Sequence, residues 1–105
     1  MEKVIVLGLG GCEHCKALVE GLESKGIAFK LVDANVDNKL ADRMEALLKT
    51  NVYPIVIVEG LGGNTYLYRE DSYEKAVPSP VAYATKVGCV TIASMIEQIK
   101  KYLNK

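Results

Sequence analysis

The sequence predicts an α/β domain with a mixed four-stranded sheet, helices on both faces and the element order β-α-β-α-β-β-α. Short apolar runs rich in valine and isoleucine alternate with amphipathic segments of 3.6-residue period, a pattern typical of β-α-β units. The strands show little alternation of apolar and polar residues, so helices should cover both faces of the sheet. We expect one domain over residues 1–105, because this length fits a single compact core.

The first half of the chain predicts two strands, each followed by a helix. Residues 3–7 form an apolar run that ends in a glycine-rich loop, and a helical stripe begins at Cys12. A second strand is expected over residues 27–32, and Asp37 or Asn38 can cap the next helix. Because a helix connects the first two strands, they should pair in parallel.

The second half predicts a hairpin and a final helix. Pro54 opens a buried strand that reaches residue 58, and residues 65–69 return antiparallel after a glycine-rich turn. Residues 70–90 contain two prolines and no regular pattern, so we expect an insertion before the last helix. Thr91 is the expected N-cap of that helix, whose apolar residues keep the 3.6-residue period.

Composition argues against several classes of function. Thirteen basic and thirteen acidic side chains give a formal net charge of zero, so nothing favours binding to nucleic acid or to an anionic membrane. No stretch approaches the roughly 20 apolar residues of a membrane helix, and the N-terminus lacks the pattern of a signal peptide. We therefore expect a cytoplasmic monomer whose three cysteines are kept reduced.

The segment Gly11-Cys12-Glu13-His14-Cys15 stands where a predicted strand gives way to a helix. The first turn of a helix offers unpaired backbone N–H groups and a partial positive charge, which stabilise a thiolate. We expect Cys12 to be exposed and to attack, and Cys15 to point inward and resolve the mixed disulfide. His14, when protonated, would increase the acidity of Cys12, and Glu13 would oppose it.

A second candidate feature is Val52-Tyr53-Pro54 at the start of the third strand. A cis bond before Pro54 would turn the Tyr53 backbone outward beside the cysteines, where it could pair with an extended, thiol-bearing partner. The alternative is a proline that simply begins a strand.

Together these residues resemble the glutaredoxin family, within the thioredoxin-like fold. The resemblance rests on Cys12-Glu13-His14-Cys15, on residues 33–37 after the second strand and on Val52-Tyr53-Pro54. It covers residues 3–69 and resumes at the final helix. The interior of the cysteine motif is Glu-His, where the family usually has Pro-Tyr.

The resemblance implies a function and a set of site residues. Cys12 would be the nucleophile, Cys15 the resolving thiol and Pro54 the cis proline, with the Tyr53 backbone holding the cysteinyl unit of glutathione. A glutathione carboxylate would meet the backbone before the last helix, which adds three substrate-binding candidates: Gly88, Cys89 and Thr91. The implied activity is reduction of protein or glutathione mixed disulfides, with glutathione as reductant or co-substrate and no bound cofactor.

Three alternatives stay open at this point. The protein could reduce protein disulfides without glutathione, or it could be a thioredoxin-like binding domain with idle cysteines. The cysteine motif also resembles that of small copper and heavy-metal carriers, because soft thiolates suit Cu(I) and Zn. Cys12, Cys15, His14 and Cys89 are a conceivable four-ligand set. We favour a buried, apolar role for Cys89 itself.

Overall fold

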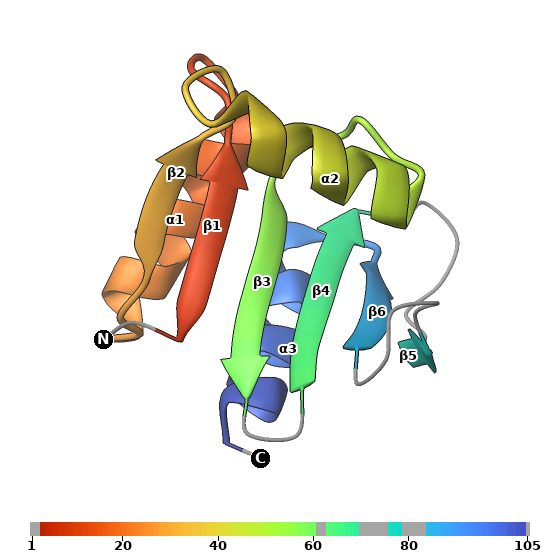
Figure 1. The fold of residues 1–105 in the computed structure, drawn as a ribbon. Coiled ribbons are helices and arrows are strands. Elements are labelled where there is room, and N and C mark those ends of the chain that lie inside the picture. Colours follow the sequence, from red (N-terminus) through yellow and green to blue (C-terminus); the bar gives the residue numbers. More distant parts are fainter. Residues whose placement is uncertain (1–2, 61–62, 70–75, 79–83, 105) are drawn as a thin grey trace.

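A computed structural model of the 105-residue chain describes residues 3–60, 63–69, 76–78 and 84–104. In these ranges, six strands and three helices follow one another along the chain (Figure 1). They are β1 (Val4–Gly8), α1 (Glu13–Ser24), β2 (Lys30–Asp33), α2 (Asn38–Leu48), β3 (Ile55–Gly60), β4 (Gly63–Arg69), β5 (Ala76–Pro78), β6 (Ala84–Cys89) and α3 (Ile92–Leu103).

The strands form one mixed sheet in the order β2-β1-β3-β4-β6-β5. β1 pairs in parallel with β2 and antiparallel with β3, so that Val6 lies opposite Leu31 on one side and Val56 on the other. β3 and β4 form the expected antiparallel hairpin, with Ile57 opposite Tyr66. The predicted β-α-β unit and hairpin are therefore confirmed.

The prediction of only four strands was wrong, because part of the expected insertion belongs to the sheet. β6 pairs in parallel with β4, from Asn64 opposite Ala84 to Arg69 opposite Cys89, and β5 pairs antiparallel with β6. The sequence of β6 includes a lysine and a glycine and has no clear period of two. Its strand structure depends on pairing with β4, which a local pattern does not reveal.

Helices cover both faces of the sheet, as predicted. α1 and α3 lie on one face and α2 lies across the other (Figure 1). The α1/α3 face is packed with fully or almost fully buried side chains from both helices and four strands. They are Val4, Val6, Leu18, Leu22, Val56, Val58, Leu67, Val87, Cys89, Met95, Ile96 and Ile99. With its mixed sheet between two helical layers, the chain has the thioredoxin-like fold.

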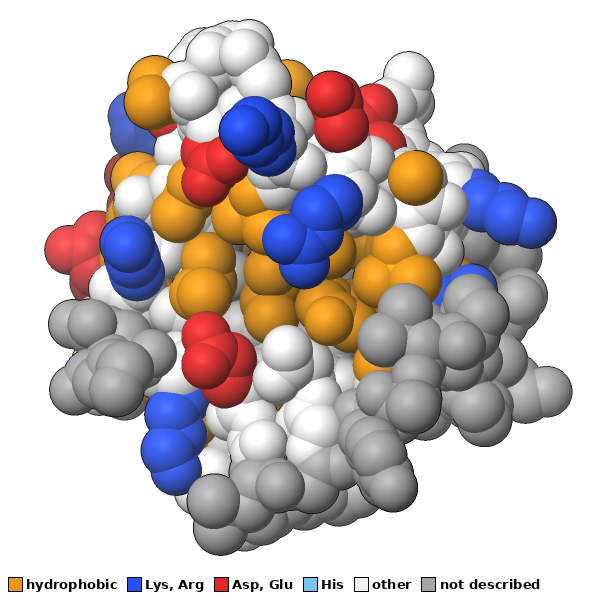
Figure 2. Space-filling view, in the orientation of Figure 1, with side chains coloured by type: hydrophobic (Ala, Val, Ile, Leu, Met, Phe, Trp, Pro, Cys, Tyr) orange, Lys and Arg blue, Asp and Glu red, His pale blue; other side chains and the backbone are white. Residues whose placement is uncertain are grey.

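The α2 face holds the second part of the core and leads to the site. Figure 2 views this face, where apolar side chains gather over the strands beside α2. The buried residues of this layer are Leu7, Cys15, Ala34, Ala41, Met44, Leu48, Tyr53, Ile55, Ile57 and Tyr66. One cysteine of the motif and the tyrosine before Pro54 therefore share a layer.

The helix caps confirm two predicted N-termini. The Asp37 carboxylate accepts a hydrogen bond from the Leu40 N–H at 3.1 Å, and the Thr91 hydroxyl accepts one from Ser94 N–H at 3.0 Å. Such caps satisfy N–H groups that have no partner within the helix. Within the ranges given above, none of the helices has the length and apolar character that crossing a bilayer requires.

Candidate active site

Cys12 is the N-cap of α1, and its sulfur takes the place that a serine or aspartate oxygen usually fills. Gly11, with φ of +78°, turns the chain after β1, a conformation that glycine adopts readily. Cys12 follows with extended backbone, and its Sγ accepts a hydrogen bond from the Cys15 N–H at 3.2 Å. The sulfur of the half-buried Cys12 therefore lies at the positive end of the helix dipole.

Cys15 lies one turn further along α1, behind Cys12. The residue is 5% exposed. Its side chain packs against the end of β1, where a Cβ on Gly8 would lie 3.4 Å from both Cβ and Sγ of Cys15. Burial, and next a side-chain hydrogen bond with Cys12, raise the pKa of the Cys15 thiol to about 11. Cys15 is therefore a neutral thiol around pH 7, and no disulfide joins any of the three cysteines.

The Tyr53–Pro54 segment lies beside this pair. Its peptide bond is cis, and the Tyr53 carbonyl oxygen accepts a hydrogen bond from the Cys12 thiol at 3.9 Å. The structure thus brings together residues 41 positions apart in the chain, as the sequence predicted. The Tyr53 main chain therefore lies where a substrate attached to Cys12 could pair with it.

Tyr53 belongs to the α2 layer, and 7% of the residue is exposed. Its phenol donates a hydrogen bond to Oε2 of Glu45 at 2.7 Å. Burial, and next this carboxylate, raise the pKa of Tyr53 to about 12. Glu45 was missed by the sequence analysis, and its spacing of eight residues from Tyr53 gives no signal, because a helix end and a loop intervene.

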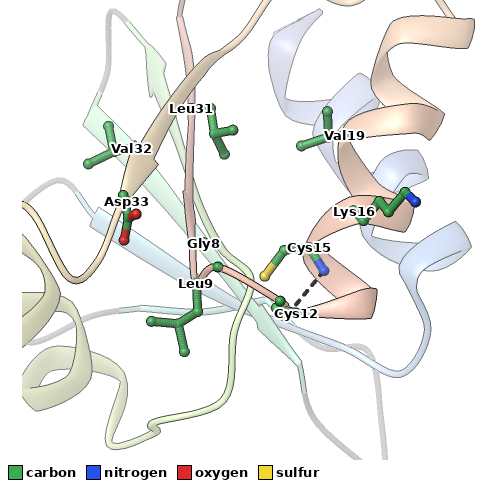
Figure 3. Close-up of a pocket in the computed structure, with 11 residues that line it drawn as sticks. Gly8, Leu9, Cys12, Cys15, Lys16, Val19, Leu31, Val32 and Asp33 are labelled. Atoms are coloured by element: carbon green, nitrogen blue, oxygen red, sulfur yellow. Dashed lines mark hydrogen bonds between the residues drawn. The ribbon is translucent and has the colours of Figure 1, made fainter.

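A cavity of about 330 Å³ lies beside the cysteine pair, between α1 and the edge strand β2 (Figure 3). Figure 3 shows the Cys15 sulfur turned toward Gly8, with Leu31 and Val19 from the two walls above it. Leu9 and Val32 add further apolar surface, and Lys16 and Asp33 supply one charge of each sign. Tyr53 is not among the lining residues, so the cavity and the Tyr53 carbonyl are separate neighbours of Cys12.

The remaining predicted site residues are more scattered. Glu13 and His14 are exposed in the first turn of α1, and neither lines the cavity. Gly88 and Cys89 end β6 and are buried, so a ligand could meet this stretch only through the backbone near the start of α3. Thr91 is exposed at the N-terminus of α3.

The conceivable four-ligand metal site does not form. Cys89 has no exposed surface and lies in the α1/α3 layer, whereas Cys15 lies in the α2 layer. The Cys89 thiol donates a hydrogen bond to the Val87 carbonyl at 3.8 Å. In the part of the chain that the structure describes, no three His, Cys, Asp or Glu side chains are grouped to hold a metal ion.

The fold and the site together define a class of protein. A thioredoxin-like domain with two thiols at the start of α1, facing a cis proline, is the framework of a thiol–disulfide oxidoreductase. A family model described as Glutaredoxin matches residues 4–61, which include both thiols and the Tyr53–Pro54 bond. The match covers more than half of the chain, so the chain belongs to the glutaredoxin family. No curated protein sequence matches it.

Proposed function

We propose that the protein reduces mixed disulfides of proteins or of glutathione by dithiol exchange through Cys12 and Cys15. The observation that carries the proposal is the arrangement of the two thiols. Cys12 is half-buried, and its sulfur accepts a hydrogen bond from the backbone N–H of Cys15. The neutral Cys15 thiol lies behind it. A partly accessible sulfur at a helix N-terminus suits attack, and a shielded thiol suits the second step.

In the first step, the Cys12 thiolate attacks one sulfur of the substrate disulfide. A new bond forms between Cys12 Sγ and that sulfur, the substrate S–S bond breaks, and the other sulfur leaves as a thiolate that takes up a proton. As Cys12 Sγ loses its negative charge, the hydrogen bond that it accepts from the Cys15 N–H becomes weaker. The product is a mixed disulfide on Cys12.

In the second step, Cys15 loses its proton and attacks Cys12 Sγ. The mixed disulfide bond breaks, the remaining substrate part leaves as a thiol, and a Cys12–Cys15 disulfide forms. The raised pKa of Cys15 was set partly by its hydrogen bond with Cys12. Once Cys12 is in a mixed disulfide it no longer carries a thiolate, so this contribution to the Cys15 pKa is removed and Cys15 deprotonates more readily.

Glutathione is the proposed co-substrate. Two glutathione molecules would return the Cys12–Cys15 disulfide to the dithiol, with glutathione disulfide as the oxidised product. The Tyr53 backbone next to Cys12 supports binding of a cysteinyl unit, and the exposed N-terminus of α3 at Thr91 supports binding of a carboxylate. We also propose that the protein acts as a monomer in the cytoplasm, where thiols are kept reduced.

The experiment is a comparison of two isosteric substitutions, Cys12→Ser and Cys15→Ser. The substrate is a mixed disulfide of glutathione with a cysteine-containing peptide. Excess glutathione, glutathione reductase and NADPH are added, and the oxidation of NADPH records turnover. Cys12→Ser should abolish turnover. Cys15→Ser should accumulate a covalent adduct on Cys12, visible by intact-protein mass spectrometry. Full turnover by Cys12→Ser, or none by the unaltered protein, would overturn the proposal.

A further inference from the structure

We infer that Glu45 is a positioning residue, whose hydrogen bond to the Tyr53 phenol holds the Tyr53 main chain at Cys12 for the bound substrate. The inference rests on the proposed function, since it concerns how a mixed disulfide is held at that site. Glu45 does not touch Cys12 in the geometry described above. It acts through Tyr53.

The contact between the two side chains is short and well supported. At 2.7 Å, the bond from the Tyr53 hydroxyl to the Glu45 carboxylate has the length of a charge-assisted hydrogen bond. Burial and the neighbouring carboxylate raise the Tyr53 pKa to about 12, so the phenol remains a donor over the whole neutral range. The half-buried Glu45 is shielded from full competition with water.

Glu45 is itself held by the end of α2. Its carbonyl accepts the N–H of Lys49, which has a left-handed backbone with φ of 54°, and the N–H of Thr50 at 3.3 Å. These bonds end the helix and turn the chain toward Tyr53. The carboxylate therefore projects from a fixed backbone position, as a positioning group must.

Tyr53 transmits this position to the site because its two ends have different neighbours. The phenol end lies in the α2 layer on Glu45, and the carbonyl end lies 3.9 Å from Cys12 Sγ. Loss of the phenol contact would free the ring to shift and the main chain with it. Misplacement of a binding group by about 1 Å can cost a large part of its effect on a reaction.

The test compares Glu45→Ala, Tyr53→Phe and the double variant, with Glu45→Gln as rescue. Asp42→Asn is the matched control, because Asp42 is an exposed carboxylate one turn away on α2 whose charge also acts on Tyr53. KM and kcat are measured with the mixed disulfide of glutathione and a cysteine-containing peptide. The rate of Cys12 alkylation by iodoacetamide is measured in parallel, because this small reagent needs no docking on Tyr53.

Glu45→Ala and Tyr53→Phe should each raise KM roughly tenfold, the effect expected for loss of a hydrogen bond to a charged group. The double variant should be no worse than either single one, because both remove the same bond. Glu45→Gln keeps an acceptor oxygen and should restore most of the affinity. Asp42→Asn should leave KM unchanged, and all variants should keep the alkylation rate. An unchanged KM with only a lower melting temperature would make the contact structural and overturn the inference.

A second measurement separates this inference from the proposed function. In a Cys15→Ser background, glutathione disulfide forms a mixed disulfide with Cys12 and releases one glutathione, and mass spectrometry gives the equilibrium constant. Glu45→Ala should lower this constant roughly tenfold, the same hydrogen-bond effect. If the unaltered protein shows no turnover, the proposed function fails, yet this constant still decides the role of Glu45. If Glu45→Ala leaves the equilibrium constant of mixed-disulfide formation unchanged, the positioning role of Glu45 is refuted.

Discussion

The sulfur of Cys12 accepts a hydrogen bond from the backbone N–H of Cys15 at 3.2 Å. The same atom is thus the cap of α1 and the proposed nucleophile. A cap contributes to folding, whereas a nucleophile contributes to chemistry, so the two roles can be separated by the choice of substitution.

Cys12→Ala should lower the free energy of unfolding by about 1 kcal/mol, the usual cost of losing an N-cap. Cys12→Ser keeps an acceptor at this position and should remain close to the unaltered protein in stability. Both variants should lack turnover. Urea unfolding followed by circular dichroism gives the comparison, and equal stability of the two variants would show that the sulfur does not cap the helix.

Stability should fall at alkaline pH because two buried groups have raised pKa values. Folding raises the pKa of Cys15 from 9.0 to about 11 and that of Tyr53 from 10.0 to about 12. The contribution of Cys15 is complete well below pH 9, and that of Tyr53 well below pH 10. They are lost as the pH rises through the folded pKa values, because the unfolded chain releases these protons first.

For Cys15, the loss should be on the order of 2 kcal/mol between about pH 8 and 11, as one pKa unit corresponds to about 1.4 kcal/mol. Urea unfolding of the reduced protein across this range measures it. Cys15→Ser removes the titrating thiol, so its curve should be flatter than that of the unaltered protein below about pH 10, where the loss from Tyr53 begins. If the curve of this variant fell as steeply as that of the unaltered protein, the thiol would have no share in the loss.

Alkylation should modify the three cysteines in a set order. Cys12 is half-buried, whereas Cys15 is 5% exposed with a pKa of about 11, and Cys89 has no exposed surface. Iodoacetamide at neutral pH should therefore modify Cys12 first, which peptide mass spectrometry at short times can follow. In guanidinium chloride the three should react at similar rates. Early modification of Cys89 in the folded protein would contradict its placement.

Gly21 allows α1 to approach α3 closely. A Cβ at this position would collide with Cδ1 of Ile96, which is almost fully buried. Gly21→Ala gains roughly 1 kcal/mol of helix propensity, but overpacking typically costs about 1–3 kcal/mol, so we expect a net loss of about 1 kcal/mol.

A double-mutant cycle checks the cause of that loss. Ile96→Val removes the colliding methyl group and alone should cost about 0.5–1.5 kcal/mol. The combination of Gly21→Ala and Ile96→Val should be more stable than the sum of the single effects predicts, by about 1 kcal/mol. Simple additivity in thermal or urea unfolding would mean that the two positions do not interact.

Much of the fold was predictable because short sequence patterns within single elements indicate it. The apolar runs of β1 and β3, the caps Asp37 and Thr91 and the stripes of the helices all carry their own signals. The strand β6 does not, since Lys86 and Gly88 interrupt its apolar character and its partner β4 supplies the ladder. Propensity within a strand depends strongly on such a partner.

The site residues also differ in how far the sequence predicts them. Cys12 and Cys15 were predicted from their spacing at a strand–helix junction, and Tyr53 was predicted from the proline that follows it. Glu45 could not be predicted, because its contact requires the end of α2 to fold back toward β3. The cavity could not be predicted either, since Leu31 on β2 and Val19 on α1 meet only in three dimensions.

The two strands at the margins of the sheet are both short. β2 has four residues and β5 has three, whereas the longer β4 and β6 lie inside the sheet. An unpaired strand edge can recruit a foreign strand and begin aggregation, and a brief edge offers few hydrogen bonds for this. A sheet that ended at β4 would instead have presented seven residues to such a partner. In the described residues, β6 and β5 extend the sheet so that the strand at this margin has three residues instead of seven.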